Sequence, residues 1–262
     1  MRRYAYLLYL QLKASTLLAL QYRADFVIDV LIEVLWAGTA VVPLFVVFQG
    51  RATVAGWSYP EALLVTGWFT ILQMLLEGAI NPSLVALVEQ VRKGTLDFVL
   101  LKPADAQFLV STTRFQPSRA INLVTAVTIF VYAFRRIGHG PSVQGVAVAC
   151  LLMAAAAVLL YSLWILTVSA VFYVVRVDNL TYLFTAVLDA ARWPSSVFRG
   201  VVKMVFTFVI PLALMTTYPA EAMLGRLQPS QLVLSFGAAI AFSLISRTVW
   251  VRAIGKYTSA SS

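Results

Sequence analysis

Long apolar runs constrain this chain more than any other feature. Six stretches approach or exceed the roughly 20 residues that a helix needs to cross a hydrocarbon layer of about 30 Å. They lie near Phe26–Phe48, Pro60–Ile80, Ser118–Phe134, Val143–Val175, a region between Asn179 and Tyr218, and Ser230–Val251. With 61% hydrophobic and only 12% charged residues, the sequence predicts an all-α integral membrane protein. Six transmembrane helices form a single transmembrane domain over residues 1–262.

The basic residues indicate which helix ends face the cytoplasm. If the six spans alternate in direction, only four of the 20 Lys and Arg fall on one face, namely Arg51, Arg135, Arg136 and Arg226. Cytoplasmic segments of multi-pass proteins carry the excess of Lys and Arg. We therefore expect both termini to be cytoplasmic. The net charge of +9 then reflects segments that face anionic lipid headgroups, and it needs no nucleic-acid partner.

Two segments on this predicted cytoplasmic side lie outside the spans. Residues 1–25 are apolar but interrupted by polar side chains, which favours a helix lying along the membrane interface. In the connection 81–117, apolar residues at helical spacing predict an amphipathic helix that ends at Gly94. A second short helix ends before Pro103. A third begins at Asp105 and runs to Gln116, where Pro117 closes it.

The fifth span has two possible placements. Hydropathy alone favours 201–218, which leaves 179–200 on the cytoplasmic side. Alternatively, 179–193 crosses the bilayer and 195–224 folds back as a re-entrant hairpin, broken by Pro194, Pro211 and Pro219. Broken backbone at this depth needs a protein or water-filled surrounding.

Motifs of soluble enzyme chemistry are missing from the sequence. There is no GxxxxGK[ST] phosphate-binding loop and no HExxH metal motif. The single histidine, His139, lies in a predicted outer loop, and the single cysteine, Cys150, lies within a span. We therefore expect no catalytic residue, no metal site and no cofactor in this chain.

Charged residues within the spans are the remaining candidates for function, because a carboxylate in hydrocarbon is costly. Asp29 and Glu33 share one face of the first span, and Glu77 has the corresponding depth on the second. They either reach the cytoplasmic interface or pair with Arg23 or Arg119, or they line an inward-facing vestibule that favours cationic substrates. In the second placement of the fifth span, Asp189 and Arg192 also enter the membrane and can neutralise each other.

The predicted cytoplasmic loop carries a specific pattern. Its residues follow the arrangement ExxRxGTLDxxLxxP, formed by Glu89, Arg92, Gly94, Thr95, Leu96, Asp97, Leu100 and Pro103. This arrangement resembles the coupling-loop signature of ABC-2 type permeases, the membrane subunits of ATP-driven exporters. The resemblance extends to the six spans, the N-terminal helix and the Pro-broken region before the last span. It is closest to compact bacterial permeases that lack a fused nucleotide-binding domain.

The resemblance implies a partner and a role for the loop. It implies that the loop docks as a coupling helix on a separate ABC ATP-binding subunit, present in two copies, which binds ATP and Mg²⁺. The residues to which the coupling role carries over are Glu89, Arg92, Lys93, Gly94, Asp97, Leu100, Lys102 and Pro103. It also implies a second permease chain, identical or homologous, a bacterial inner membrane, and the re-entrant hairpin.

These implications define the expected function. The chain is a permease subunit without an ATPase site of its own, and it exports an amphiphilic or hydrophobic substrate by alternating access. The alternative is a stand-alone secondary transporter or pore, which would often show two similar halves that this sequence lacks. The substrate itself is not readable from the sequence.

Overall fold

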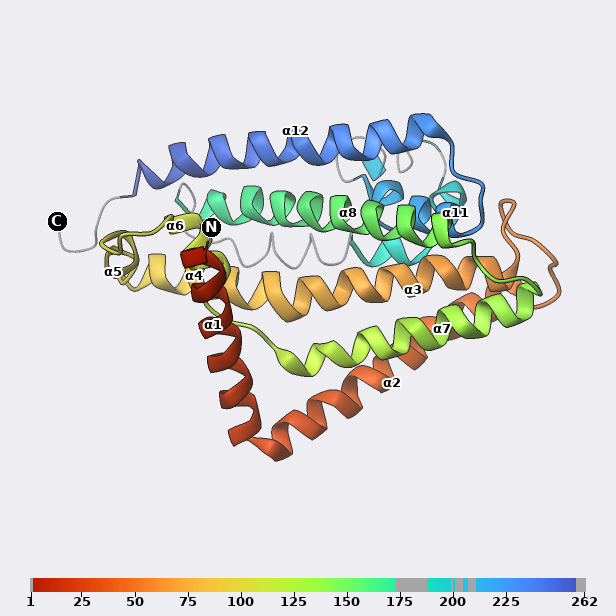
Figure 1. Ribbon diagram of the computed structural model, residues 1–262, viewed down its shortest axis with the longest axis horizontal. Coiled ribbons are helices and arrows are strands. Elements are labelled where there is room, and N and C mark those ends of the chain that lie inside the picture. Colours follow the sequence, from red (N-terminus) through yellow and green to blue (C-terminus); the bar gives the residue numbers. More distant parts are fainter. Residues whose placement is uncertain (1, 173–187, 199, 201–204, 207–210, 258–262) are drawn as a thin grey trace.

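The computed structural model describes residues 2–172, 188–198, 200, 205–206 and 211–257 as a bundle of long helices (Figure 1). Within these residues, five helical stretches are long and apolar enough to cross a membrane: Arg23–Phe48, Tyr59–Arg92, Pro117–Ile137, Val143–Phe172 and Pro229–Ile254. No β-strand occurs in the described residues. The predicted all-helical, multi-pass character is therefore confirmed, whereas a sixth span is not seen as a long helix in the described part of the chain.

The long helices pack side by side, some of them parallel and some antiparallel (Figure 1). In chain order the elements are α1 (Arg2–Gln21), α2 (Arg23–Phe48), α3 (Tyr59–Leu75), η1 (Leu76–Ile80), α4 (Asn81–Arg92), α5 (Asp97–Leu100), α6 (Ala106–Ser111), η2 (Pro117–Ala120), α7 (Ile121–Ile137), α8 (Val143–Ser169), η3 (Ala170–Phe172), η4 (Asp189–Arg192), η5 (Ser195–Val197), η6 (Ala213–Thr217), α11 (Tyr218–Met223) and α12 (Pro229–Ile254). Helix α8 packs along α12 and α11, and α3 packs along α7. Small side chains such as Ala155 and Ala239 lie at the α8–α12 seam, where they allow close approach in lipid.

The bundle has two distinct ends. We call the end at which α1 begins and α12 finishes the terminal end, and the other the distal end (Figure 1). Helix α1 runs crosswise to the long helices, and none of its residues is buried (Figure 1). It ends at Gln21, and α2 begins at Arg23 rather than at Phe26. The interfacial position of residues 1–25 stays a prediction.

The second span is longer than expected and includes the predicted amphipathic helix. Residues Tyr59–Arg92 form one continuous stretch of 34 residues, which at about 1.5 Å per residue measures roughly 50 Å and outreaches the hydrocarbon layer. A π-helical turn, η1, joins its two parts, and Pro82 follows at the start of α4. Pro82 has no N–H to donate, and the wider π turn accommodates the missing bond without ending the helix. The second span therefore continues without a break into the predicted amphipathic helix, and the cytoplasmic position of 81–117 stays a prediction.

The third short helix is also shorter than expected. Asp105 caps α6, accepting a hydrogen bond from the Phe108 N–H at 3.0 Å, as predicted. The helix nevertheless ends at Ser111 instead of Gln116, and Pro117 begins η2 rather than closing a helix. The reason is tertiary, because the backbone N–H groups of 114–116 bond to other elements. Their acceptors are Ser83 Oγ at 3.0 Å, Ser15 Oγ at 3.2 Å and the Gly78 carbonyl at 2.8 Å.

The region of the fifth span is described only in part. Ser196 Oγ donates to the Ala55 carbonyl at 3.2 Å, which places it at the distal end beside the loop between α2 and α3. The hydropathy-based placement, with 179–200 at the predicted cytoplasmic end, is therefore wrong for Ser196. Residues 191–195 lie against 216–217 through two hydrogen bonds, Thr216 Oγ1 to the Ala191 carbonyl and Ser195 N–H to Thr217 Oγ1. The re-entrant hairpin stays a prediction, since 173–187, 199, 201–204 and 207–210 lie outside the described residues.

Candidate functional site

A polar pocket of about 340 Å³ lies between α2, α3 with its π turn, the start of α7, and η4. Its polar wall contains Asp29, Glu33, Thr39, Thr70, Gln73, Glu77, Arg119, Asn122, Asp189 and Arg192. All five residues that the sequence proposes for a substrate pathway, namely Asp29, Glu33, Glu77, Asp189 and Arg192, belong to this wall. The fold thus gathers them from α2, η1 and η4. Their role in transport stays a prediction.

Glu33 is the most completely partnered of these residues. Its side chain is buried, and one carboxylate oxygen forms an ion pair with the Arg119 guanidinium. Asn122 Nδ2 donates to the other oxygen at 2.7 Å. A buried carboxylate of this kind needs a charge partner and hydrogen bonds to offset its lost hydration. Glu33 therefore joins α2 to the start of α7, which is the pairing that the sequence offered as the alternative to a vestibule.

Glu77 lies in the π turn, a distortion often found at functional sites. Asn81 Nδ2 donates to its carboxylate at 3.2 Å. The turn also brings η1 against η2. A Cβ atom built on Gly78 would lie 3.2 Å from Arg119 Cβ, so the missing side chain allows Arg119 to approach this closely. The sequence offered Arg119 as a possible partner of Glu77, and the fold places both in one pocket, but Arg119 forms its ion pair with Glu33.

Asp189 and Arg192 neutralise each other, as expected from their spacing. Arg192 Nη2 lies 2.9 Å from Asp189 Oδ1, and the guanidinium carbon lies 5.4 Å from the centre of the Phe69 ring. Thr66 Oγ1 contacts the Arg192 carbonyl at 3.5 Å, which fixes η4 against α3. The pair therefore contributes no net charge to the pocket.

The pocket as a whole carries an excess of negative charge. Its four carboxylates face two guanidinium groups, and both guanidinium groups are already paired. Asp29 and Glu77 form no salt bridge within the described part of the chain. Two carboxylates without a salt bridge, in a pocket between apolar helices, favour the binding of a cationic group.

The predicted coupling residues lie together at the terminal end. Glu89, Arg92 and Lys93 are exposed on the last turn of α4, and the Glu89 and Lys93 side chains lie 3.9 Å apart. Gly94 has a φ of +67°, the left-handed conformation that ends many helices. Asp97 and Leu100 lie in α5, while Lys102 and Pro103 are exposed in the turn that follows. Burial, and then the charge of Asp97, raises the pKa of Tyr257, so Asp97 lies beside the residues that follow α12.

Besides Leu100, two further large apolar residues of this segment are exposed, and sequence reasoning missed both. Phe98 is 70% and Leu101 81% exposed, whereas Leu96 between α4 and α5 is completely buried. Leu96 therefore anchors the segment, and Phe98 and Leu101 project from it. Exposed aromatic and large aliphatic side chains on a fixed backbone are typical anchors of protein interfaces. The signal was present in the sequence as large apolar side chains within a short loop that also carries charged residues.

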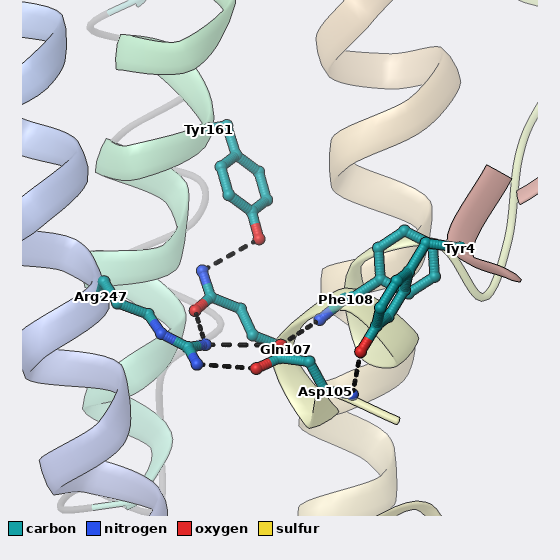
Figure 2. A network of polar contacts seen from close by, with 6 residues as sticks. All are labelled: Tyr4, Asp105, Gln107, Phe108, Tyr161 and Arg247. Atoms are coloured by element: carbon teal, nitrogen blue, oxygen red, sulfur yellow. Dashed lines mark hydrogen bonds and ion pairs between the residues drawn. The ribbon is translucent and has the colours of Figure 1, made fainter. Parts of the chain in front are cut away.

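A polar network holds the start of α6 against α12 and α8 (Figure 2). Arg247 of α12 donates from Nη2 to Asp105 at 2.7 Å and from Nη1 to Gln107 Oε1 at 2.7 Å. Gln107 Nε2 in turn donates to the Tyr161 hydroxyl of α8 at 3.1 Å. Charge-assisted hydrogen bonds are stronger than neutral ones. The segment that follows the coupling residues is thus tied to the last span.

The same network reaches α1. The Asp105 N–H donates to the Tyr4 hydroxyl at 3.2 Å, and the Tyr4 and Phe108 rings meet edge to face with centroids 4.8 Å apart (Figure 2). Burial by itself raises the pKa of Asp105, but hydrogen bonds from Arg247 and from the Phe108 N–H outweigh it. The net effect is a lowered pKa.

This lowered pKa predicts how the network responds to acid. A carboxylate with a depressed pKa stabilises the fold above its unfolded pKa of about 3.9, and that contribution is lost as the pH falls through the lower folded value. We expect the protection of the α6 amides, measured relative to their intrinsic exchange rate at each pH, to fall only below about pH 4. Asp105→Asn should show faster exchange already at pH 7, because it keeps the helix cap but loses the Arg247 ion pair. Hydrogen–deuterium exchange measures both, and identical exchange in wild type and Asp105→Asn at pH 7 would contradict the assignment.

Comparison with known proteins gives one match. A family model described as "ABC-2 family transporter protein" matches residues 34–261. The match includes residues 89–103 with the predicted coupling residues, here called the coupling segment, and most of the polar pocket. It leaves out α1 and the start of α2 with Asp29 and Glu33. No curated protein and no solved structure matches the chain significantly.

Proposed function

Because the chain belongs to the ABC-2 family of transporter proteins, we propose that it is the permease subunit of an ATP-driven exporter in a bacterial inner membrane. Two copies of a separate ATP-binding subunit bind ATP and Mg²⁺. A second permease chain, identical or homologous, completes the membrane pathway. The permease contributes no ATPase site of its own, and its termini face the cytoplasm.

The observation that carries this proposal is the exposed coupling segment with its fixed base. Phe98 and Leu101 project from the terminal end, surrounded by exposed charges on α4 and after α5. Apolar anchors within a charged rim are the usual composition of a specific protein interface. The family match supports an ATPase as the occupant, because ABC-2 permeases work with an ABC ATP-binding subunit.

The polar network supplies a route for force. When the two ATP-binding subunits close on ATP, the coupling segment shifts with them as a rigid body. Asp105 and Gln107 are bonded to Arg247, so the shift reaches α12, and Tyr161 passes it to α8. The long stretch Tyr59–Arg92 carries the same shift directly into the polar pocket through the π turn.

Co-purification tests the proposal. The full-length chain, purified in mild detergent from its native host, should retain a protein with a GxxxxGK[ST] loop at equal stoichiometry, and the complex should hydrolyse ATP. Purified chain that moves solutes across liposomes without any such partner would overturn it and favour a secondary carrier or pore.

We further propose that the polar pocket binds the cationic group of an amphiphilic substrate. Asp29 and Glu77 supply the negative charge, while Trp36 and Phe69 supply an apolar and aromatic wall. Aromatic faces also attract cations. Glu33 does not bind the cation while its ion pair with Arg119 is intact, because Arg119 and Asn122 occupy its two oxygens.

Neutralising these two carboxylates should weaken binding of an organic cation. Asp29→Asn with Glu77→Gln is expected to raise the Kd for tetraphenylphosphonium roughly tenfold or more, since a hydrogen bond or ion pair to a charged group contributes about 1.5–3 kcal/mol. Equilibrium dialysis of the chain in nanodiscs measures the Kd. Tetraphenylborate, of similar size but opposite charge, should show no saturable binding, and Glu89→Gln, which removes an exposed carboxylate outside the pocket, should change nothing. Equal affinity for both ions would contradict the proposal.

A further inference from the structure

A second pocket, of about 590 Å³, lies at the terminal end between α1, α4 and the extended residues 113–116. Its wall combines apolar side chains, among them Leu18, Val85 and Phe115, with the charged groups of Arg114 and Glu77. A pocket with both kinds of wall suits an amphiphile. It also borders α1, the helix that lies crosswise to the bundle (Figure 1).

The two pockets share two residues. Glu77 and Arg119 line the polar pocket and the second pocket alike, so their side chains separate the two spaces. Asn81, which donates to Glu77, belongs to the second pocket. Arg119 is held from both pockets, because Glu33 on the side of the polar pocket forms its ion pair and Gln116 Oε1 on the side of the second pocket accepts from its Nε at 3.2 Å. The partition therefore consists of two charged side chains, and the Glu33–Arg119 ion pair joins it to the wall of the polar pocket.

We propose that the second pocket is the entry chamber for the substrate and that the Glu33–Arg119 ion pair is the gate between it and the polar pocket. The inference rests on the proposed transport function. An amphiphile enters beside α1, and its cationic head engages Glu77, which faces both chambers. The gate opens when Arg119 leaves Glu33.

An exchange of charge partners lowers the free-energy cost of this opening within the membrane. Asp29 is close enough to Arg119 to interact with it electrostatically. Arg119 can therefore move towards Asp29 while the cationic head takes its place beside Glu33. Each carboxylate keeps a positive partner, which avoids an uncompensated buried charge.

Cysteine labelling tests the gate without requiring transport. In a Cys150→Ala background, Ala14→Cys reports on the second pocket and Ala37→Cys on the polar pocket, as matched substitutions. The membrane-impermeant probe is trimethylammonium-ethyl methanethiosulfonate, added to sealed vesicles from the side of the coupling segment. We expect the cysteine at 37 to react at least about tenfold more slowly than that at 14, which corresponds to about 1.4 kcal/mol in the barrier.

Removing the gate should abolish this difference. Glu33→Gln with Arg119→Gln deletes both charges together, and it should raise labelling at 37 about tenfold while labelling at 14 stays unchanged. Glu77→Gln should slow the cationic reagent at 37 but not the anionic sulfonatoethyl reagent. Should the double variant fail to assemble, Asn122→Ala loosens Glu33 alone and should give a smaller increase.

Three results would overturn the gate: equal rates at 14 and 37 with the ion pair intact, labelling of 37 only from the opposite side, or no increase in either gate variant. None of these measurements needs ATP or the ATP-binding subunit. A working gate in a chain that retains no ATPase would therefore refute the proposed function alone, and a retained ATPase with an unchanged labelling pattern would refute the gate alone.

Discussion

A chain carrying Phe98→Asp and Leu101→Asp is expected to keep its membrane helices folded but to lose its ATP-binding partner. Both side chains project from the terminal end and make little contact with the rest of the chain, so their exchange removes no core packing. Truncating interface anchors commonly costs about 2–4 kcal/mol each, and a buried unpaired carboxylate adds to this. We expect the affinity for the ATP-binding subunit to fall roughly thousandfold, measured by quantitative co-purification and by the ATPase rate of the complex.

Conservative variants provide the control for this prediction. Phe98→Tyr with Leu101→Met keeps the size and apolar character of the anchors and should retain the partner. The melting temperature of the isolated chain should be the same in wild type and in both variants. Full ATPase activity in the Asp variant would show that the partner docks elsewhere.

The second large effect is expected at Glu33. Replacing it with Leu leaves the Arg119 guanidinium without its ion-pair partner and Asn122 without its acceptor. Breaking one side of a buried ion pair typically destabilises a protein by about 3–5 kcal/mol. We therefore expect a clear drop in the thermal midpoint of the purified chain, measured by loss of monodisperse protein after heating in detergent.

A double variant separates the ion pair from general packing. Glu33→Leu with Arg119→Met replaces both charges by apolar groups and should recover most of the lost stability, since such exchanges are often close to neutral. Asp29→Asn, one turn earlier on the same helix, has no salt bridge in the described part of the chain and should change the midpoint little. If Glu33→Leu alone has no effect, the pair does not hold α2 to α7.

The membrane helices were predictable because each of them has its own long run of apolar residues. Five of the six apolar runs are long helices in the structure, since in lipid a segment must satisfy its backbone hydrogen bonds internally. Local turn signals also worked where a single residue decides the geometry, as at Gly94 and at the Asp105 cap. They failed for the end of α6, where hydrogen bonds to α1, α4 and η1 replace helical ones.

The candidate sites were predictable to different degrees. Isolated charges in apolar runs marked Asp29, Glu33 and Glu77, because such residues are rare in spans. Nothing local distinguished Arg119 as the partner of Glu33 over Arg23, nor Arg247 and Tyr161 as partners of Gln107. These pairs join residues that are far apart in the sequence, and only the packing of the helices brings them together.

Taken alone, the amino-acid sequence determined that the chain is an all-helical membrane protein, and it marked the loop that carries the coupling residues. Both properties depend on short continuous stretches of sequence, namely apolar runs of about twenty residues for the spans and one local motif for the loop. The tertiary structure alone decided that α4 continues the helix of the second span, that six charged residues share one pocket, and that Glu77 and Arg119 line both this pocket and a second one. The reason is that ion pairs and pockets depend on the distance between helices, and a linear pattern of residues does not encode that distance.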